Sequence, residues 1–176
     1  LRVVPVPAGG SRHRAALVAL GGEGARVPLL QDRAAGRVVS GKDAILLHLF
    51  ATYRPKKPTI PLRYRAGSTS SKLATRIRAG RGLTATPANH AEQDLELYSF
   101  ESSPFSRLVR ERLTELELAY YLHNLAKEQR ADIGPAGKKL TFGKPYKPVP
   151  GGKREKLLAR GGDIKVPYLN DSNIGT

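Results

Sequence analysis

Residues 95–118 read LELYSFESSPFSRLVRERLTELEL. The first six residues have the apolar and aromatic pattern of a short strand. The rest predicts a helix over about residues 103–118, because five apolar residues fall on one face at helical spacing: Phe105, Leu108, Val109, Leu113 and Leu116. Ser103 is placed to cap the free amides of this helix, and Pro104 occupies the first helical position, where its missing N–H costs nothing. We therefore expect the helix to pack its apolar face against the strand at 95–100.

The chain also contains an internal repeat. The first copy, from Gly9, reads GGSRHRAALVALGGEGARVPLLQDRAAG, and the second, from Gly151, reads GGKREKLLARGGDIKVPYLNDSNIG. Each copy predicts a short helix that ends at a Gly pair and is followed by a strand. Val27-Pro28 and Val166-Pro167 stand at the start of these strands. Position alone leaves two interpretations open. The first is a bend or a cis peptide at each proline, and the second is an edge strand that begins with a trans proline.

Other elements surround the repeat. LRVVPVP at 1–7 and AYYLHNLA at 119–126 have the composition of strands. GRVVSGKDAILLHLFATY at 36–53 predicts a strand followed by a helix whose apolar residues are Ile45, Leu46, Leu49 and Phe50. We expect the Gly- and Pro-containing segment from Gly134 to Gly152 to be a surface insertion or a partner-contacting loop.

Composition restricts the function. The 176 residues include 30 Lys and Arg against 15 Asp and Glu, and the net charge of +15 favours anionic partners such as nucleic acid, anionic lipid or acidic protein. The absence of Cys excludes disulfides, thiolate zinc sites and cysteine redox chemistry. The four His, at 13, 48, 90 and 123, lack a ligand-like spacing, so we expect neither a metal nor a cofactor. No apolar run reaches the roughly 18 to 20 residues that a membrane-spanning helix needs.

Much of the charge lies in one segment. Residues 54–91 contain nine basic residues and no acidic one. We expect this basic linker to bind the partner, chiefly through Lys56, Lys57, Arg63, Arg65, Arg76, Arg78 and Arg81.

The order of strand, capped helix, strand, helix and Val-Pro strand in residues 95–176 resembles the thioredoxin fold of glutathione S-transferase N-terminal domains. Together with the second repeat, it looks like the plant and algal plastid proteins that carry two such domains in tandem. The resemblance implies an α/β chain with a first thioredoxin-like domain at 1–53, a basic linker at 54–94 and a second thioredoxin-like domain at 95–176. The first would lack its opening strand and helix and the second its last strand and helix, so we expect a fragment of a longer protein.

The resemblance also places a degenerate redox and glutathione site. Thiol-active relatives carry a Cys at the helix start, where this chain has Ser103-Pro104-Phe105-Ser106, and the resemblance implies cis bonds at Val166-Pro167 and Val27-Pro28. Serine at a helix start is more often a cap than a nucleophile, and no His is near it in sequence to act as a base. The groove beside Val166-Pro167 either pairs with an extended peptide or is packed shut. At the last helix of the first copy, Gly41-Lys42 replaces the Glu-Ser or Gln-Ser pair that holds glutathione in relatives.

These features predict a non-catalytic protein with a binding or scaffolding role. We expect a subunit or assembly factor of a larger plastid complex that docks on an acidic protein surface, with a photosynthetic membrane complex as the first expectation. One alternative is a glutathione transferase-like enzyme that uses Ser103 or Ser106. Another is RNA binding through the linker, which is less favoured because Tyr53 and Tyr64 are the only aromatic residues near it.

Overall fold

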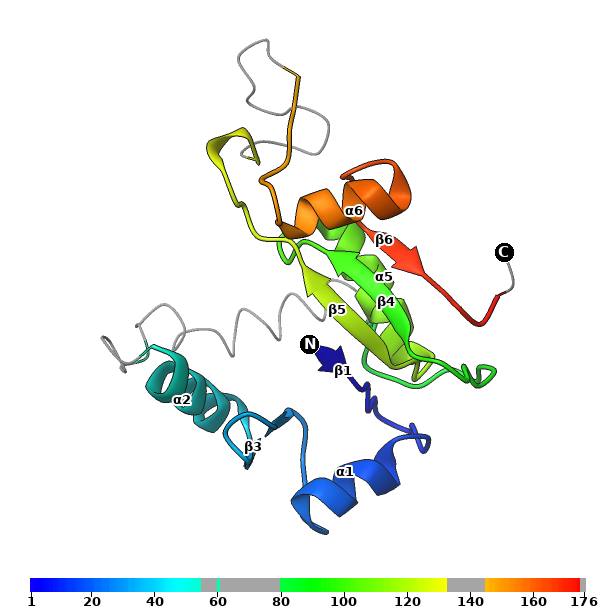
Figure 1. The fold of residues 1–176 in the computed structure, drawn as a ribbon. Helices are drawn as coiled ribbons and strands as arrows, with labels where there is room; N and C mark the ends of the chain where they lie inside the picture. The colour runs from blue at the N-terminus through cyan, green and yellow to red at the C-terminus, as the bar shows by residue number, and fades with distance from the viewer. Residues whose placement is uncertain (55–59, 61–79, 133–144, 175–176) are drawn as a thin grey trace. The chain divides into compact units, whose positions relative to one another are not determined.

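The computed structural model describes residues 1–54, 60, 80–132 and 145–174 (Figure 1). Contacts divide the chain into a C-terminal unit, made of Leu1–Pro5 and Pro87–Thr176, and an N-terminal unit, Val6–Thr86. This division differs from the predicted ranges 1–53, 54–94 and 95–176. The opening residues join the C-terminal unit because their backbone pairs with a strand of that unit.

The C-terminal unit is built on a four-stranded sheet in the order β1-β5-β4-β6. Its strands are β1 (Arg2–Val3), β4 (Leu95–Ser99), β5 (Tyr120–Asn124) and β6 (Tyr168–Asn170). β4 runs parallel to β5, whereas β6 is antiparallel to β4 and β1 is antiparallel to β5. The sheet is therefore mixed, and the strands predicted at 95–100 and 119–126 are its two central strands.

α5 (Pro104–Glu115) covers one face of this sheet. Leu113 is buried with three sheet residues, Leu95, Leu97 and Tyr120, and Val109 packs against the same cluster. The predicted helix is thus confirmed, but part of its predicted apolar face is wrong. Phe105 is 64% exposed and Leu108 48% exposed, because the helix meets the sheet through the turns that carry Val109 and Leu113.

α6 (Lys153–Gly161) packs on residues of the opposite face. Tyr98 is buried with Leu125 and Leu157, whereas its neighbour Leu97 lies in the α5 cluster, because successive residues of a strand point to opposite faces. The helix ends at the repeat's second Gly pair. A Cβ on Gly161 would lie 2.7 Å from the Tyr168 ring, so glycine lets the end of α6 approach β6 closely.

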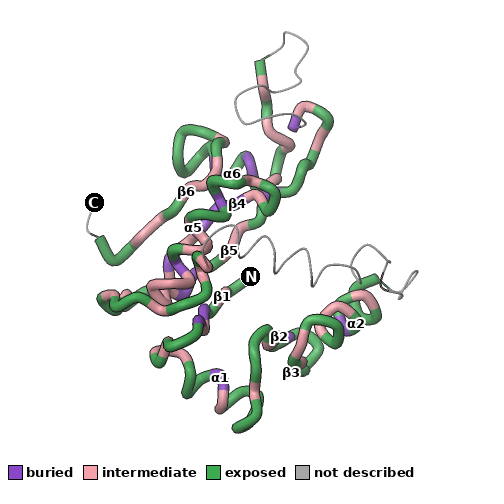
Figure 2. Tube along the Cα trace, turned by 180° about the vertical axis from the view of Figure 1, so that it is seen from behind, coloured by how far each residue is buried: buried purple, intermediate pink, exposed green. Residues whose placement is uncertain are grey.

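The N-terminal unit contains α1 (Arg14–Gly21), β2 (Leu29–Asp32), β3 (Arg37–Ser40) and α2 (Lys42–Tyr53). β2 and β3 form an antiparallel hairpin with Leu29 opposite Ser40 and Asp32 opposite Arg37. The predicted order of helix, strand, strand and helix is confirmed. The buried residue of α2 is His48, and the apolar Leu49 is 38% exposed. The rest of α2 is intermediate or exposed (Figure 2).

The described part of the insertion between β5 and α6 is anchored by Asp132, in the single 3-10 turn Arg130–Asp132. The buried Asp132 carboxylate accepts hydrogen bonds from the Tyr146 hydroxyl at 2.6 Å and from the amides of Glu128 and Gln129. Arg154 of α6 lies 3.5 Å from it. Burial alone would raise the pKa of Asp132, but these donors and the Arg154 charge outweigh it and hold the pKa below its usual value.

Candidate binding site

The start of α5 carries the predicted site residues of the C-terminal unit. Ser103 is extended, and its Oγ accepts a hydrogen bond from the Ser106 N–H at 3.2 Å, with Pro104 at the first helical position. The predicted cap is therefore formed. Phe105 beside it is largely exposed.

Ser106 is fully buried, and its Oγ accepts the Phe100 N–H at 3.4 Å. Within the described residues, no hydrogen bond joins the hydroxyl of Ser103 or Ser106 to a histidine or a carboxylate. A serine nucleophile needs an adjacent base and access to substrate. In this geometry one hydroxyl caps the helix and the other is packed beneath it.

The second part of the predicted site is the Val166-Pro167 peptide, which is cis, as is Val27-Pro28. Both predicted cis bonds are confirmed. β6 begins directly after Pro167, and its antiparallel register places Tyr168 opposite Tyr98, near the end of β4 from which the chain enters α5. The cis peptide and the start of α5 consequently lie at the same end of the sheet.

β6 is an outer strand of this sheet. Within the described residues, β4 is its one partner in the sheet. Leu169, in the middle of this strand, is 42% exposed.

One polar interaction at this end was not predicted. Ser99, the last residue of β4, is fully buried, and the Arg110 guanidinium donates to its Oγ at 2.6 Å and to the Glu101 carbonyl at 3.3 Å. This guanidinium therefore joins α5 to β4 and to the connection between them. The sequence did not indicate this hydrogen bond. It contains only a serine at the end of a strand and an arginine eleven residues later, and that combination is common.

In the N-terminal unit, the predicted position to compare with a glutathione site is the start of α2. α2 begins at Lys42 after Gly41, whose backbone is in a positive-φ conformation, and no side chain caps it. Lys42 instead lies 3.6 Å from Asp43 on the surface. The start of α2 therefore provides no side-chain cap.

Six of the seven predicted partner-binding residues, Lys56, Lys57, Arg63, Arg65, Arg76 and Arg78, lie outside the described residues. Arg81 is described and exposed. It lies next to a short parallel bridge in which the Ala8 N–H donates to the Leu83 carbonyl at 2.7 Å and the Ala85 N–H donates to the Ala8 carbonyl at 2.9 Å. The end of the linker is therefore fixed to the start of the N-terminal unit.

A comparison with protein families found a match in the C-terminal unit. Residues 97–176 match the family described as glutathione S-transferase, N-terminal domain. The chain contains a thioredoxin-like domain of this family. Searches of curated proteins and of solved structures found no match to the chain.

The described ranges contain neither a membrane-spanning helix nor a cluster of metal ligands. None of the helices there is long and apolar enough to span a bilayer. Nor does that part of the chain gather three or more His, Asp or Glu side chains in a way that could hold a metal ion.

Proposed function

We propose that this chain is a non-catalytic binding protein in which thioredoxin-like domains serve as docking platforms. The observation that carries the proposal is the state of the two serines at the start of α5. Ser106 is fully buried and Ser103 caps the helix, so neither hydroxyl is placed as an activated nucleophile. With no Cys in the chain, the redox chemistry of the fold has no thiol to use.

We further propose that the two units are a tandem pair of thioredoxin-like domains. In each unit a helix that ends at a Gly pair is followed by a cis Val-Pro peptide and a strand. This agreement extends from sequence to backbone conformation and therefore supports a structural repeat.

The partner we propose is an acidic surface of a multi-subunit plastid complex, and a photosynthetic membrane complex is the first candidate. The support is the charge of +15 together with the basic linker, because plastid membrane surfaces and their proteins carry abundant negative charge. This chain, as a subunit or assembly factor, would be bound to the complex mainly by electrostatic attraction.

Co-purification of the chain from plastid extract, followed by mass spectrometry and cross-linking, tests this function. We expect an acidic partner that is released between low and physiological salt, where the screening length shortens to about 8 Å. Reversal of Arg76, Arg78 and Arg81 to Glu should abolish association and leave the fold intact. A monomer that purifies without a partner would refute the proposal. Formation of a glutathione conjugate by the wild-type protein, with this activity lost in Ser103→Ala, would show that the protein is an enzyme.

A further inference from the structure

A buried polar network lies at the closed end of the β2–β3 hairpin. The Asp32 carboxylate accepts a hydrogen bond from the Tyr53 hydroxyl at 2.7 Å and lies 2.8 Å from the His48 Nε2. Its other oxygen accepts the Ala35 N–H at 3.1 Å. Asp32 and His48 are 9% and 7% exposed, so a carboxylate and an imidazole are buried together in this unit.

The network holds an exposed aromatic ring in place. Tyr53 is the last residue of α2 and is 57% exposed, yet its hydroxyl bonds to the buried Asp32 carboxylate. Binding to a side chain that is already fixed costs little conformational entropy, and tyrosine is enriched among residues that dominate binding energy. An exposed ring that is fixed from beneath is therefore suited to contact a partner.

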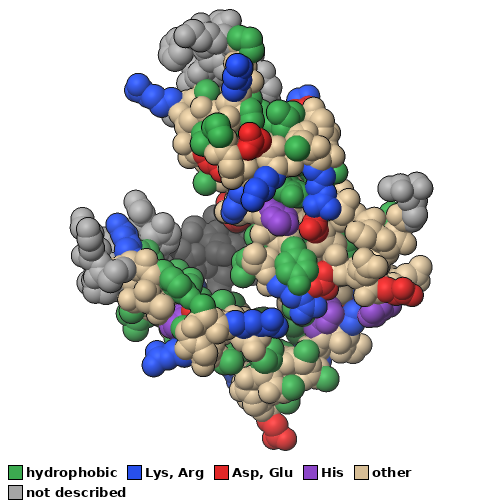
Figure 3. All heavy atoms as spheres, in the orientation of Figure 1, with side chains coloured by type: hydrophobic (Ala, Val, Ile, Leu, Met, Phe, Trp, Pro, Cys, Tyr) green, Lys and Arg blue, Asp and Glu red, His purple; other side chains and the backbone are tan. Residues whose placement is uncertain are grey.

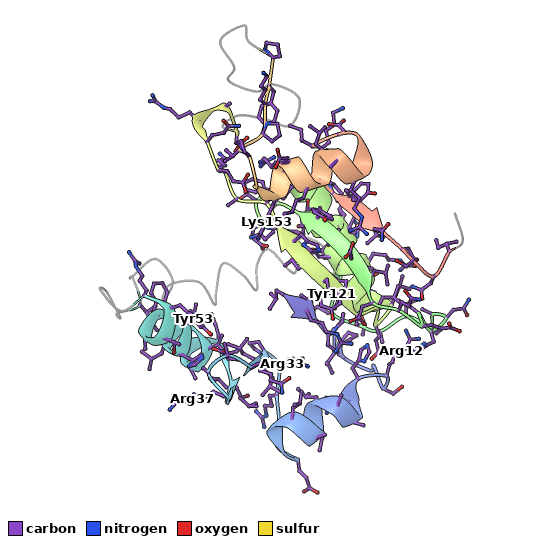
Figure 4. The ribbon with its side chains drawn as sticks, viewed as in Figure 1. Arg12, Arg33, Arg37, Tyr53, Tyr121 and Lys153 are labelled. Carbon is purple, nitrogen blue, oxygen red and sulfur yellow. The ribbon has the colours of Figure 1, made fainter. Side chains whose placement is uncertain are left out.

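Three arginines are neighbours of Asp32 or Tyr53 in sequence or in strand register. Arg37 is the register partner of Asp32, Arg33 follows Asp32 in the turn, and Arg54 follows Tyr53 with its guanidinium 5.7 Å from the centre of the Phe50 ring. Arg33, Arg37 and Arg54 are all exposed. Figure 4 labels Arg33 in the hairpin turn, Arg37 at the start of β3 and Tyr53 at the end of α2.

The sequence of this unit is basic. Residues 6–86 contain 15 Lys and Arg against 3 Asp and Glu. Nine of the 15 belong to the linker at 54–91, and residues 6–53 contain six against three, a net charge of +3. One of the three acidic residues is the buried Asp32. On the face drawn in Figure 3, Lys and Arg side chains of the N-terminal unit lie among exposed hydrophobic ones.

We infer that Arg33, Arg37, Tyr53 and Arg54 form a docking surface, the hairpin-tip surface, for an acidic, extended peptide segment of a partner protein. The inference rests on the proposed function and names the contact site on the folded unit, in addition to the linker. Carboxylates of the segment would pair with the guanidiniums, which bind them in a bidentate geometry, while its apolar stems would contact the Tyr53 ring. A single fixed tyrosine favours a peptide, because single-stranded nucleic acid is bound by successive stacking aromatics.

Fluorescence anisotropy with a labelled poly-glutamate peptide, at fixed low salt, tests the surface in the full chain. Three double variants change the net charge equally: Arg33→Glu with Arg37→Glu at the hairpin tip, Arg14→Glu with Arg26→Glu as the control, and Arg76→Glu with Arg78→Glu in the linker. Arg26 lies at the other end of the hairpin, where its carbonyl accepts the Ser40 hydroxyl. We expect affinity to fall about tenfold or more for the hairpin-tip pair and less than about threefold for the control pair.

Variants of Tyr53 leave the net charge unchanged, so they measure what the fixed tyrosine ring contributes to peptide affinity. Tyr53→Ala should lower the affinity severalfold, and Tyr53→Phe, which keeps the ring but loses the bond to Asp32, should lower it less. Circular dichroism melts identify any variant that has unfolded, and Tyr53→Phe remains informative if Tyr53→Ala does unfold.

Equal losses of peptide affinity in the hairpin-tip and control pairs would overturn the inference. The proposed function would then be judged separately, from the affinity of the linker pair. Tighter binding of a poly-uridine oligonucleotide, lost in the hairpin-tip pair, would also overturn it, because the surface would then recognise nucleic acid.

Discussion

The Arg110 guanidinium donates a hydrogen bond to the Oγ of the fully buried Ser99 at 2.6 Å. Arg110→Met should destabilise the C-terminal unit by about 1.5–3 kcal/mol, because a charge-assisted bond is lost and a buried hydroxyl loses its donor. Arg112→Met is the matched control. Arg112 pairs with Glu115 at 3.0 Å on the exposed side of α5, where ion pairs contribute about 0–1 kcal/mol. Urea unfolding of both variants measures the difference, and equal losses would contradict the role given to Arg110.

The α5 face provides a second prediction. Leu113 is 4% exposed in the core between α5 and the sheet, so Leu113→Asp should unfold the C-terminal unit by burying an unpaired charge. Leu108→Asp introduces the same charge on the same helix at a 48% exposed position and should cost less than about 1 kcal/mol. Circular dichroism melts distinguish them. An unchanged melting temperature for Leu113→Asp would refute the packing of this helix.

The cap of α5 provides a third prediction. Ser103→Ala removes the acceptor for the Ser106 N–H and should cost about 1 kcal/mol of stability without changing partner association. The neighbouring exposed Ser102 gives the control, Ser102→Ala, which we expect to be neutral. Urea unfolding and co-purification are the two measurements. Loss of partner binding in Ser103→Ala with an intact fold would place Ser103 in the interface.

Acid stability should depend on Asp32. Hydrogen bonds from Tyr53 and then His48 lower the pKa of Asp32 to about 2, whereas in the unfolded chain it returns to about 3.9. The folded pKa is the lower one, so Asp32 stabilises the N-terminal unit above about pH 4, and this contribution is lost as the pH falls from about 4 to about 2. Amide hydrogen exchange of α2 and the hairpin across this range measures it.

Asp32→Asn should remove this pH dependence, and Tyr53→Phe should weaken it. Asp43→Asn serves as the control, because the Asp43 side chain is 82% exposed. A pH dependence that persists unchanged in Asp32→Asn would show that another group causes it.

Several features could be read from the sequence because they depend on residues close together in the chain. The capped start of α5 follows from Ser103 and Pro104, and the strand and helix periods follow from the spacing of apolar residues. The repeat, compared with relatives, also predicted the cis bond at Val166-Pro167. Local conformation of this kind is favoured by nearby residues whatever the rest of the chain does.

Other features depend on residues far apart in sequence. The pairing of Arg2–Val3 with Tyr120–Tyr121 moves the start of the chain into the C-terminal unit, and Asp32 and His48 are buried because they satisfy each other. The exposure of Phe105 also depends on distant residues. It has the helical spacing of a core residue, but it lies beyond the contact that Leu113 makes with the sheet. A pattern in the sequence marks which residues are able to be buried. Only the tertiary structure decides which of them find a partner, because burial of a side chain requires a surface supplied by a distant part of the chain.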